Sequence, residues 1–326
     1  MGKRIASFAA FLPPLALLTL LLLAPSEASA GAQRGLSVCA GVIVPSLFPF
    51  LLLSSYLTAM GLPAALGKLA APLLSRLSLP AVSAAPFLLG LCGGYPAGAS
   101  AVAALVRSGA LTPEEGARLL PCCNNTGPGF LIGVAGAAVF GSVRLGALLY
   151  LSHVLAALTL LLLSGRRRAA SVCVPTVPAP RLGSVSAFPA CVSGAAETTL
   201  HICGYVVFFS VLTALLQSVG LISALAGAMA LRFGMELRVC LALLSGLLEL
   251  GSGVAALRGA APTPANLALA AFLLGFGGLA VHAQTLYAVS GTQIKCARHF
   301  AGRIIHGLLS AVYVLFFLAL FRRPRI

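Results

Sequence analysis

The chain has 326 residues, of which 60% are hydrophobic and only 8% are charged. Soluble globular chains carry about a quarter charged residues. Together with a mean hydropathy of +1.05, this composition excludes a soluble enzyme, a soluble nucleic-acid-binding protein and a disordered chain, and it indicates an integral membrane protein. The net charge of +15 arises from 21 basic residues against six acids, all of them Glu. The basic residues are scattered between apolar blocks, which is typical of topology signals and contacts with anionic lipid.

Motifs for metal binding, hydrolysis or ATP use are missing from the sequence. The nine cysteines form no CxxC pair, and histidine does not cluster with them, so we expect neither zinc nor a disulfide framework. There is no GxxxxGK[ST] loop, no GxSxG element and no Asp. We therefore expect a protein that is not an enzyme and has no cofactor, apart from a coupling cation or proton.

The first predicted element lies in residues 1–30. Lys3 and Arg4 precede an apolar run over residues 5–24, and Ala28-Ser29-Ala30 resembles a signal-peptidase site. The segment reads either as a cleaved signal or as a first transmembrane helix. We favour the helix, because the rest of the chain is also apolar.

A first repeat is predicted over residues 31–168. Its elements are a span, an interfacial helix, a hairpin, a broken helix and a closing span, at residues 35–60, 61–79, 86–107, 112–140 and 145–163. The hairpin is expected to be re-entrant, because each flank of its Gly/Pro-rich break is too short to cross a bilayer. Thr112 before Pro113 and two Glu marks a helix start, and residues 123–129 cannot continue that helix smoothly.

A Pro-rich linker, residues 169–183, is predicted to lead into a second repeat, residues 184–326, with the same plan. Its elements are a long span, an interfacial piece, an interrupted segment, a broken helix starting at Thr263, a polar stretch and a final span, at residues 188–219, 221–238, 239–258, 263–278, 290–303 and 304–321. The fold class is thus an all-α polytopic membrane protein with two repeats, re-entrant hairpins and broken helices. Such paired breaks indicate a transporter site.

The positive-inside rule favours inverted repeats, which leaves the basic tail at residues 322–325 outside. If residues 239–258 crossed the membrane completely, the tail would lie inside and the repeats would not be inverted.

Four breaks supply the candidate binding residues. Backbone without helix is tolerated at membrane depth only inside protein or beside a cavity, and the positive ends of half-helices suit an anion. The Asn side chains need partners in hydrocarbon, which a substrate can supply. The candidates for substrate binding are Gly94, Tyr95, Pro96, Gly98, Asn124, Asn125, Thr126, Gly127, Gly251, Ser252, Gly277, Gly278, His282 and Gln284.

Glu249 is the only acid deep in an apolar run. An intramembrane carboxylate indicates function, and we assign it to a coupling ion or to gating because it would repel an anionic substrate. The alternative is a structural pair with a basic group. His153 and His306 are expected to be structural, and Glu197 and His201, four residues apart, to form a pair on one helix.

These motifs carry a family resemblance over roughly residues 30–320. The elements are Gly93-Gly94-Tyr95-Pro96-Ala97-Gly98, Pro121-Cys122-Cys123-Asn124-Asn125-Thr126-Gly127-Pro128, Glu249-Leu250-Gly251-Ser252-Gly253 and Gly277-Gly278-Leu279-Ala280-Val281-His282-Ala283-Gln284. The sequence resembles the YlbJ/SpoVV-type sporulation integral membrane proteins. That group belongs with the nucleoside-recognition (gate) domain proteins, which are similar to the core of concentrative nucleoside transporters. One departure is the Leu-Gly-Ser-Gly after Glu249, where a tighter Thr-x-Gly pattern is expected.

The resemblance implies a transporter in endospore formation, with dipicolinic acid moved from the mother cell across the outer forespore membrane. The implied partners are the lipid bilayer, a small anionic substrate and no nucleic acid, with a homo-oligomer or other sporulation membrane proteins left open. The alternatives are a nucleoside or nucleobase transporter and a scaffold in spore-envelope assembly that transports nothing.

Overall fold

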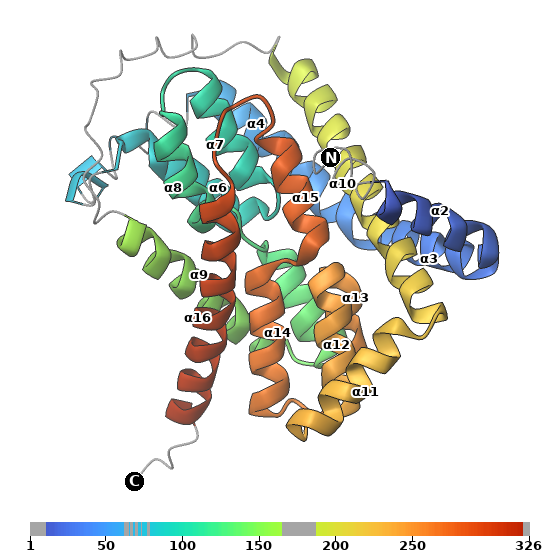
Figure 1. Ribbon diagram of the computed structural model, residues 1–326. Coiled ribbons are helices and arrows are strands. Elements are labelled where there is room, and N and C mark those ends of the chain that lie inside the picture. Colours follow the sequence, from blue (N-terminus) through green and yellow to red (C-terminus); the bar gives the residue numbers. More distant parts are fainter. Residues whose placement is uncertain are drawn as a thin grey trace, which may run out of the picture.

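The computed structural model describes residues 11–61, 65, 68, 71–72, 74–76, 79–164 and 187–321, and in these residues the chain forms helices and no strands (Figure 1). Four helices are long and apolar enough to cross a membrane. They are α9 (Val143–Ser164), α10 (Ala187–Ser218), the pair α14 and α15 (Pro264–Ala288 together) and α16 (Ala297–Phe321). The protein is therefore an all-α polytopic membrane protein, as its composition predicts.

The N-terminal helices form a bent pair. Helices α2 (Leu12–Leu23) and α3 (Pro25–Val38) meet at an angle of 102°, so by length and composition they are either one broken span or a re-entrant loop. The helical run continues through η1 (Cys39–Ile43) into α4 (Val44–Ala59). The predicted span at 35–60 is thus helical but part of a longer run. Residues 1–10, most of the predicted interfacial helix at 61–79 and the predicted linker at 169–183 lie outside the described residues.

Short helices separated by breaks fill the rest of the first half. After η2 (Ala81–Ser83), α6 (Ala84–Gly93) and α7 (Ala97–Arg107) fold back on each other. Helix α8 (Pro113–Cys123) is separated from η3 (Gly129–Val139) by a non-helical break. Thr112 is the N-cap of α8, where its side chain and that of Glu115 form a capping box, which satisfies two otherwise unpaired N–H groups.

The second half also contains interrupted helices. Helix α11 (Leu221–Phe233) is followed by α12 (Leu237–Leu248) and α13 (Leu250–Ala256), which pack against each other around the break at Glu249. Helix α14 (Pro264–Phe276) starts at the predicted N-cap Thr263 and gives way to α15 (Gly278–Ala288) at Gly277, whose φ of +93° ends the helix.

The predicted polar stretch at residues 290–303 is too long. Helix α16 already begins at Ala297, so Arg303 lies inside a helix rather than in a loop. Its neighbours His299, Gly302 and His306 are buried, and this tertiary contact, which a one-dimensional polarity pattern does not contain, accounts for the error.

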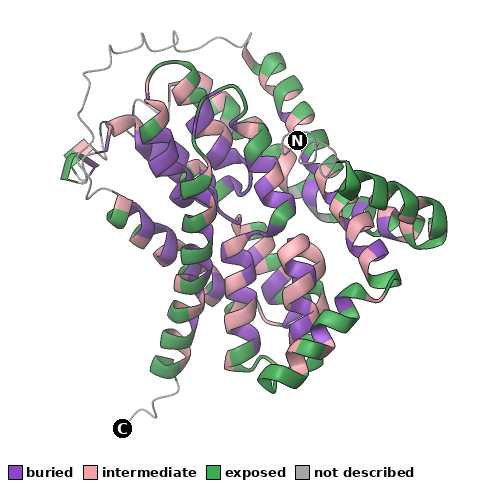
Figure 2. Cartoon of the chain, in the orientation of Figure 1, coloured by how far each residue is buried: buried purple, intermediate pink, exposed green. Residues whose placement is uncertain are grey.

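The halves interlock rather than standing apart. Helix α9 of the first half packs against α14 and α16 of the second, η3 packs against α13, and α10 packs along α3 and α4. Buried residues gather where these helices meet, whereas the outer sides of α2, α3 and the lower part of α16 are exposed (Figure 2). Large apolar side chains on those outer sides, such as Leu22 and Phe316, are suited to contact with lipid.

Candidate functional site

Three of the four breaks line one central cavity of about 120 Å³, and helix α15, which follows the fourth break, lines it as well. Its wall includes Gly94 and Tyr95 from the α6–α7 break, and Thr126 and Gly127 from the α8–η3 break. The second half supplies Glu249 and Gly251 from the α12–α13 break, and Val281 and Gln284 from α15. The remaining wall is mainly apolar and comes from η1, α4, η3 and α10. Residues far apart in the sequence therefore form a single site.

The tip of the α6–α7 hairpin is packed tightly against the next break. A Cβ added at Gly90 or Gly98 would lie 1.6 Å or 1.7 Å from the carbonyl oxygen of Cys123. Only glycine permits this approach, so Gly98, predicted to bind substrate, is required for packing. Gly94 has φ of +78°, and the Tyr95–Pro96 bond is cis.

Tyr95 connects the cavity wall to a buried cation. Its hydroxyl donates a hydrogen bond to the carbonyl of Leu274 (3.0 Å) and accepts one from Nη2 of Arg303. The guanidinium lies 5.2 Å from the centre of the Tyr95 ring, a distance at which a cation and an aromatic face attract. Thr126 Oγ1 donates to the same Leu274 carbonyl (2.7 Å), so two breaks of the first half are joined to α14.

Arg303 is fully buried, and among the residues that the structure describes no carboxylate lies within ion-pair distance of it. Its Nη1 atom donates to the carbonyl of Pro121 (3.4 Å) and lies 2.6 Å from Nδ1 of His306. His306 in turn contacts the carbonyl of His153 at 3.0 Å, with the two rings 4.3 Å apart. The two histidines are thus buried against each other, and His306 contacts the guanidinium.

The two Asn residues are fully buried and lie behind the cavity wall rather than in it. Asn124 Nδ2 donates to Thr285 Oγ1 (2.7 Å), and Asn125 Nδ2 donates to the carbonyl of Cys122 (2.8 Å). The side-chain oxygens of both lack a hydrogen-bond partner within the described chain. Asn124 joins the first half to α15, and Asn125 stabilises its own break.

Glu249 lines the cavity and caps α13. Its carboxylate accepts hydrogen bonds from the backbone N–H groups of Gly251 (2.7 Å) and Ser252 (2.6 Å). The positive end of α13 is therefore occupied by the chain's own carboxyl group. No basic side chain in the described residues forms an ion pair with it, so the structural alternative from the sequence is not the arrangement seen.

Helix α15 presents Gln284 to the cavity but not His282. His282 is buried against Phe276 and His299, with ring centres 4.7 Å and 5.3 Å away. Gly277 lies against Tyr95, since an added Cβ would be 3.0 Å from the phenol oxygen, and one at Gly278 would be 2.7 Å from the carbonyl of Gly246. Gly277 thus permits close contact between the halves, and Gly278 permits close contact between α15 and α12.

The predicted residues thus divide into two groups. Those that line the cavity are Gly94, Tyr95, Thr126, Gly127, Glu249, Gly251 and Gln284. Those placed outside its wall are Pro96, Gly98, Asn124, Asn125, Ser252, Gly277, Gly278 and His282. Sequence reasoning missed Arg303 and the apolar wall residues Phe130, Ile202 and Val206. Arg303 gave no signal, because it stands at the end of the predicted polar stretch, where a basic residue is ordinary. Ile202 and Val206 follow the helical spacing of α10, which could have indicated a shared side of that helix.

The helices, the breaks and the lipid-suited exterior define an integral membrane protein with a site enclosed between its two halves. A family model described as nucleoside recognition (Gate) matches residues 40–188. Over 320 aligned residues the chain is 29% identical to the sporulation integral membrane protein YlbJ of Bacillus subtilis (strain 168). The alignment covers 89% of this chain and 78% of that relative. The chain is therefore similar to the nucleoside-recognition (Gate) model over these residues and to a YlbJ-type sporulation membrane protein over most of its length. No solved structure matches it significantly.

Proposed function

We propose that this protein transports a small anionic metabolite across the membrane, with the central cavity as its binding site. The observation that carries the proposal is that three helix breaks, two from the first half and one from the second, line one cavity together with α15, which follows the fourth break. Broken helices that meet between two halves are the arrangement through which secondary transporters bind substrate and alternate access. The proposal includes inverted repeats and re-entrant placement of the α6–α7 and α12–α13 hairpins.

The preference for an anion rests on Arg303. The guanidinium lies directly behind Tyr95, in a part of the protein from which water is excluded. Because charges act over longer distances where the dielectric constant is low, this cation attracts an anion in the cavity without touching it. Tyr95 separates the two, and its ring offers a flat surface for a planar substrate.

We propose dipicolinic acid as the substrate, exported from the mother cell through the outer forespore membrane. This choice is supported by the similarity to a sporulation integral membrane protein and by the fit of a small planar acid to a mainly apolar cavity beside Tyr95. Glu249 would then respond to a coupling proton or cation, because neutralising its carboxylate weakens the cap that fixes α13.

A nucleoside or nucleobase is the second candidate. It is favoured by the match to a nucleoside-recognition model and by the carboxylate and amide of Glu249 and Gln284, which suit an uncharged polar ring. A scaffold without transport activity needs no cavity between its two halves, so no feature of the site favours it.

Flux into proteoliposomes distinguishes these functions. We expect uptake of labelled dipicolinate, not uridine, and a roughly ten- to hundredfold weaker apparent affinity in Gln284→Ala, because one buried polar contact is worth about 1–3 kcal/mol. Gln293→Ala, in an exposed loop, is the matched control. Uridine uptake alone would establish the second candidate, and the absence of flux of both compounds would refute transport.

A further inference from the structure

One face of α10 borders three neighbouring cavities. Thr198 and Ile202 line a second cavity of about 280 Å³, Ile202 and Val206 line the central one, and Ser210, Thr213 and Gln217 line a third of about 770 Å³. Together with Thr198, Ile202 and Val206, these last three residues recur every three or four positions, so all six share one side of the helix. They are called the route face below.

The route face is long enough to cross a membrane. From Thr198 to Gln217 the helix rises about 28 Å, close to the roughly 30 Å of a bilayer's hydrocarbon core. Neighbouring cavities also share wall residues: Ile202 and Gln284 border the second and the central cavity, and Val38 and Gly251 border the central and the third. These shared residues mark where one cavity adjoins the next.

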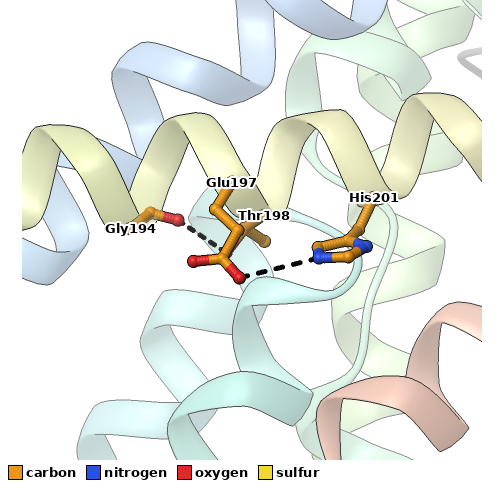
Figure 3. Close-up of polar contacts among 4 residues, drawn as sticks. All are labelled: Gly194, Glu197, Thr198 and His201. Carbon is orange, nitrogen blue, oxygen red and sulfur yellow. Dashed lines mark hydrogen bonds and ion pairs between the residues drawn. The ribbon is translucent and has the colours of Figure 1, made fainter.

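The second cavity is aromatic and basic. Besides Arg107 and Tyr205, its wall contains His201, whose ring centre lies 4.3 Å from that of Tyr287. Glu197 stands one turn away on α10 and contacts His201 at 3.7 Å, as predicted for this pair (Figure 3). Figure 3 also shows Thr198, whose hydroxyl donates to the carbonyl of Gly194 (2.8 Å) and leaves its methyl group free. This end of α10 offers flat rings and a cation to an arriving solute.

The third cavity is lined by small hydroxyls and amides. Ser37, Gln33 and the basic Arg34 face Thr213 and Gln217 across it. Each end of the route face therefore has an Arg in its cavity wall, while its middle is narrow and apolar at Ile202 and Val206. The opposite side of α10 differs, because Leu200 and Phe208 are exposed by 72% and 48%, which suits contact with lipid.

We infer that the route face of α10 forms one wall of a continuous path for a small planar anion, with the second and third cavities as its two mouths. The path rests on the proposed transport function, because it gives the central site an entrance and an exit. Ile202 with Gln284 closes one side of the central cavity, and Val38 with Gly251 closes the other. Alternating access then consists of opening one of these constrictions at a time.

Accessibility to a charged thiol reagent tests the path. The full chain is first prepared with Ser in place of its exposed and half-buried cysteines, namely Cys92, Cys191, Cys203 and Cys296. Cys173, which lies outside the described residues, is replaced as well. Single cysteines are then introduced by Thr198→Cys, Ser210→Cys and Thr213→Cys, with Leu200→Cys and Phe208→Cys as controls on the lipid side. The probe is a methanethiosulfonate that carries a sulfonate group.

We expect the route-face cysteines to react at least about tenfold faster than the controls, because the thiolate is the reactive form and a thiol facing hydrocarbon stays protonated. Dipicolinate should slow the reaction at Ser210→Cys and Thr213→Cys. Equal rates on both sides of α10, or unreactive route-face positions, would overturn the path.

A second variant pair links the path to transport. Thr213→Trp places a bulky ring in the third cavity and is expected to abolish flux, whereas Phe208→Trp on the lipid side should leave it within twofold. Normal flux in Thr213→Trp would overturn the path while the proposed function stands. If the unmodified chain carries no dipicolinate at all, the proposed function fails, and the thiol labelling still decides whether a water-filled path exists.

Discussion

Replacing Tyr95 by Phe removes the one hydroxyl that connects the cavity wall to Arg303. The carbonyl of Leu274 keeps a partner in this variant, because Thr126 Oγ1 also donates to it. In contrast, the Nη2 atom of Arg303 loses its hydrogen-bond partner within the described residues. Its side chain is fully buried, and its Nε atom is already without a partner there. The variant therefore leaves more of a buried cation unsolvated while it preserves the aromatic ring.

The expected cost follows from the kind of hydrogen bond that is lost. A bond to a charged group contributes about 1.5–3 kcal/mol, whereas one between neutral groups contributes about 0.5–1.5 kcal/mol. Tyr313→Phe is the matched control, because the Tyr313 hydroxyl bonds to the neutral hydroxyl of Thr159 (2.7 Å) between α16 and α9. We expect Tyr95→Phe to lower the free energy of unfolding by about 2 kcal/mol and the control by about half as much.

Equilibrium unfolding in mixed micelles, driven by increasing SDS and followed by helical circular dichroism, measures both variants. Dipicolinate binding is measured alongside, and it should weaken in Tyr95→Phe only, because the guanidinium is free to reorient. If Tyr95→Phe is no less stable than Tyr313→Phe and binds dipicolinate normally, the assignment of Arg303 as the counter-charge is wrong.

Three further variants test local arguments. Gly98→Ala pushes a Cβ into the Cys123 carbonyl and should cost about 1–3 kcal/mol of unfolding free energy, whereas Gly194→Ala, with open space around it, should be neutral or stabilising. Glu249→Gln keeps one acceptor of the α13 cap, so we expect the free energy of unfolding to fall by about 1 kcal/mol. Dipicolinate binding, measured by titration, should become tighter, and weaker binding would contradict the argument that Glu249 repels the anion. Thr112→Ala removes a capping box and should destabilise the protein by about 1 kcal/mol in the same unfolding assay.

Helix starts and breaks were predictable because their signals are local. Thr112 and Thr263 cap helices at the expected positions, and Gly277 ends α14 with a φ that other residues rarely adopt. The interruption at Glu249 was equally visible, although its role as the N-cap of α13 was not. These features depend on a few neighbouring residues, so the amino-acid order alone contains them.

The division of the candidates between wall and interior was less predictable. On a helix, Gln284 and Val281 are three residues apart and share a side, whereas His282 is turned away from both, and the cavity indeed excludes His282. This could have been argued from the spacing. The burial of Asn124 could not, because its partner Thr285 lies 161 residues away. Arg303 was missed for the same reason, since Tyr95 is 208 residues away.

The electrostatics of the cavity depend on two charges that are held independently. Glu249 is the charged residue of the wall, and two backbone N–H groups stabilise its carboxylate. Arg303 lies behind Tyr95 and is solvated by the phenol oxygen, the Pro121 carbonyl and His306. The two groups are held by different partners, so the cavity has a basic group behind Tyr95 and an acidic group at the start of α13.

It follows that the site favours a solute whose negative charge is concentrated at one end. For a dicarboxylate, the second carboxyl group must enter with a proton or a cation beside Glu249, which is the coupling role proposed for that residue. The net charge of +15 contains none of this information, because most basic residues lie outside the site. In the proposed transporter, selectivity depends instead on one buried Arg behind Tyr95 and on one Glu in the cavity wall that caps α13.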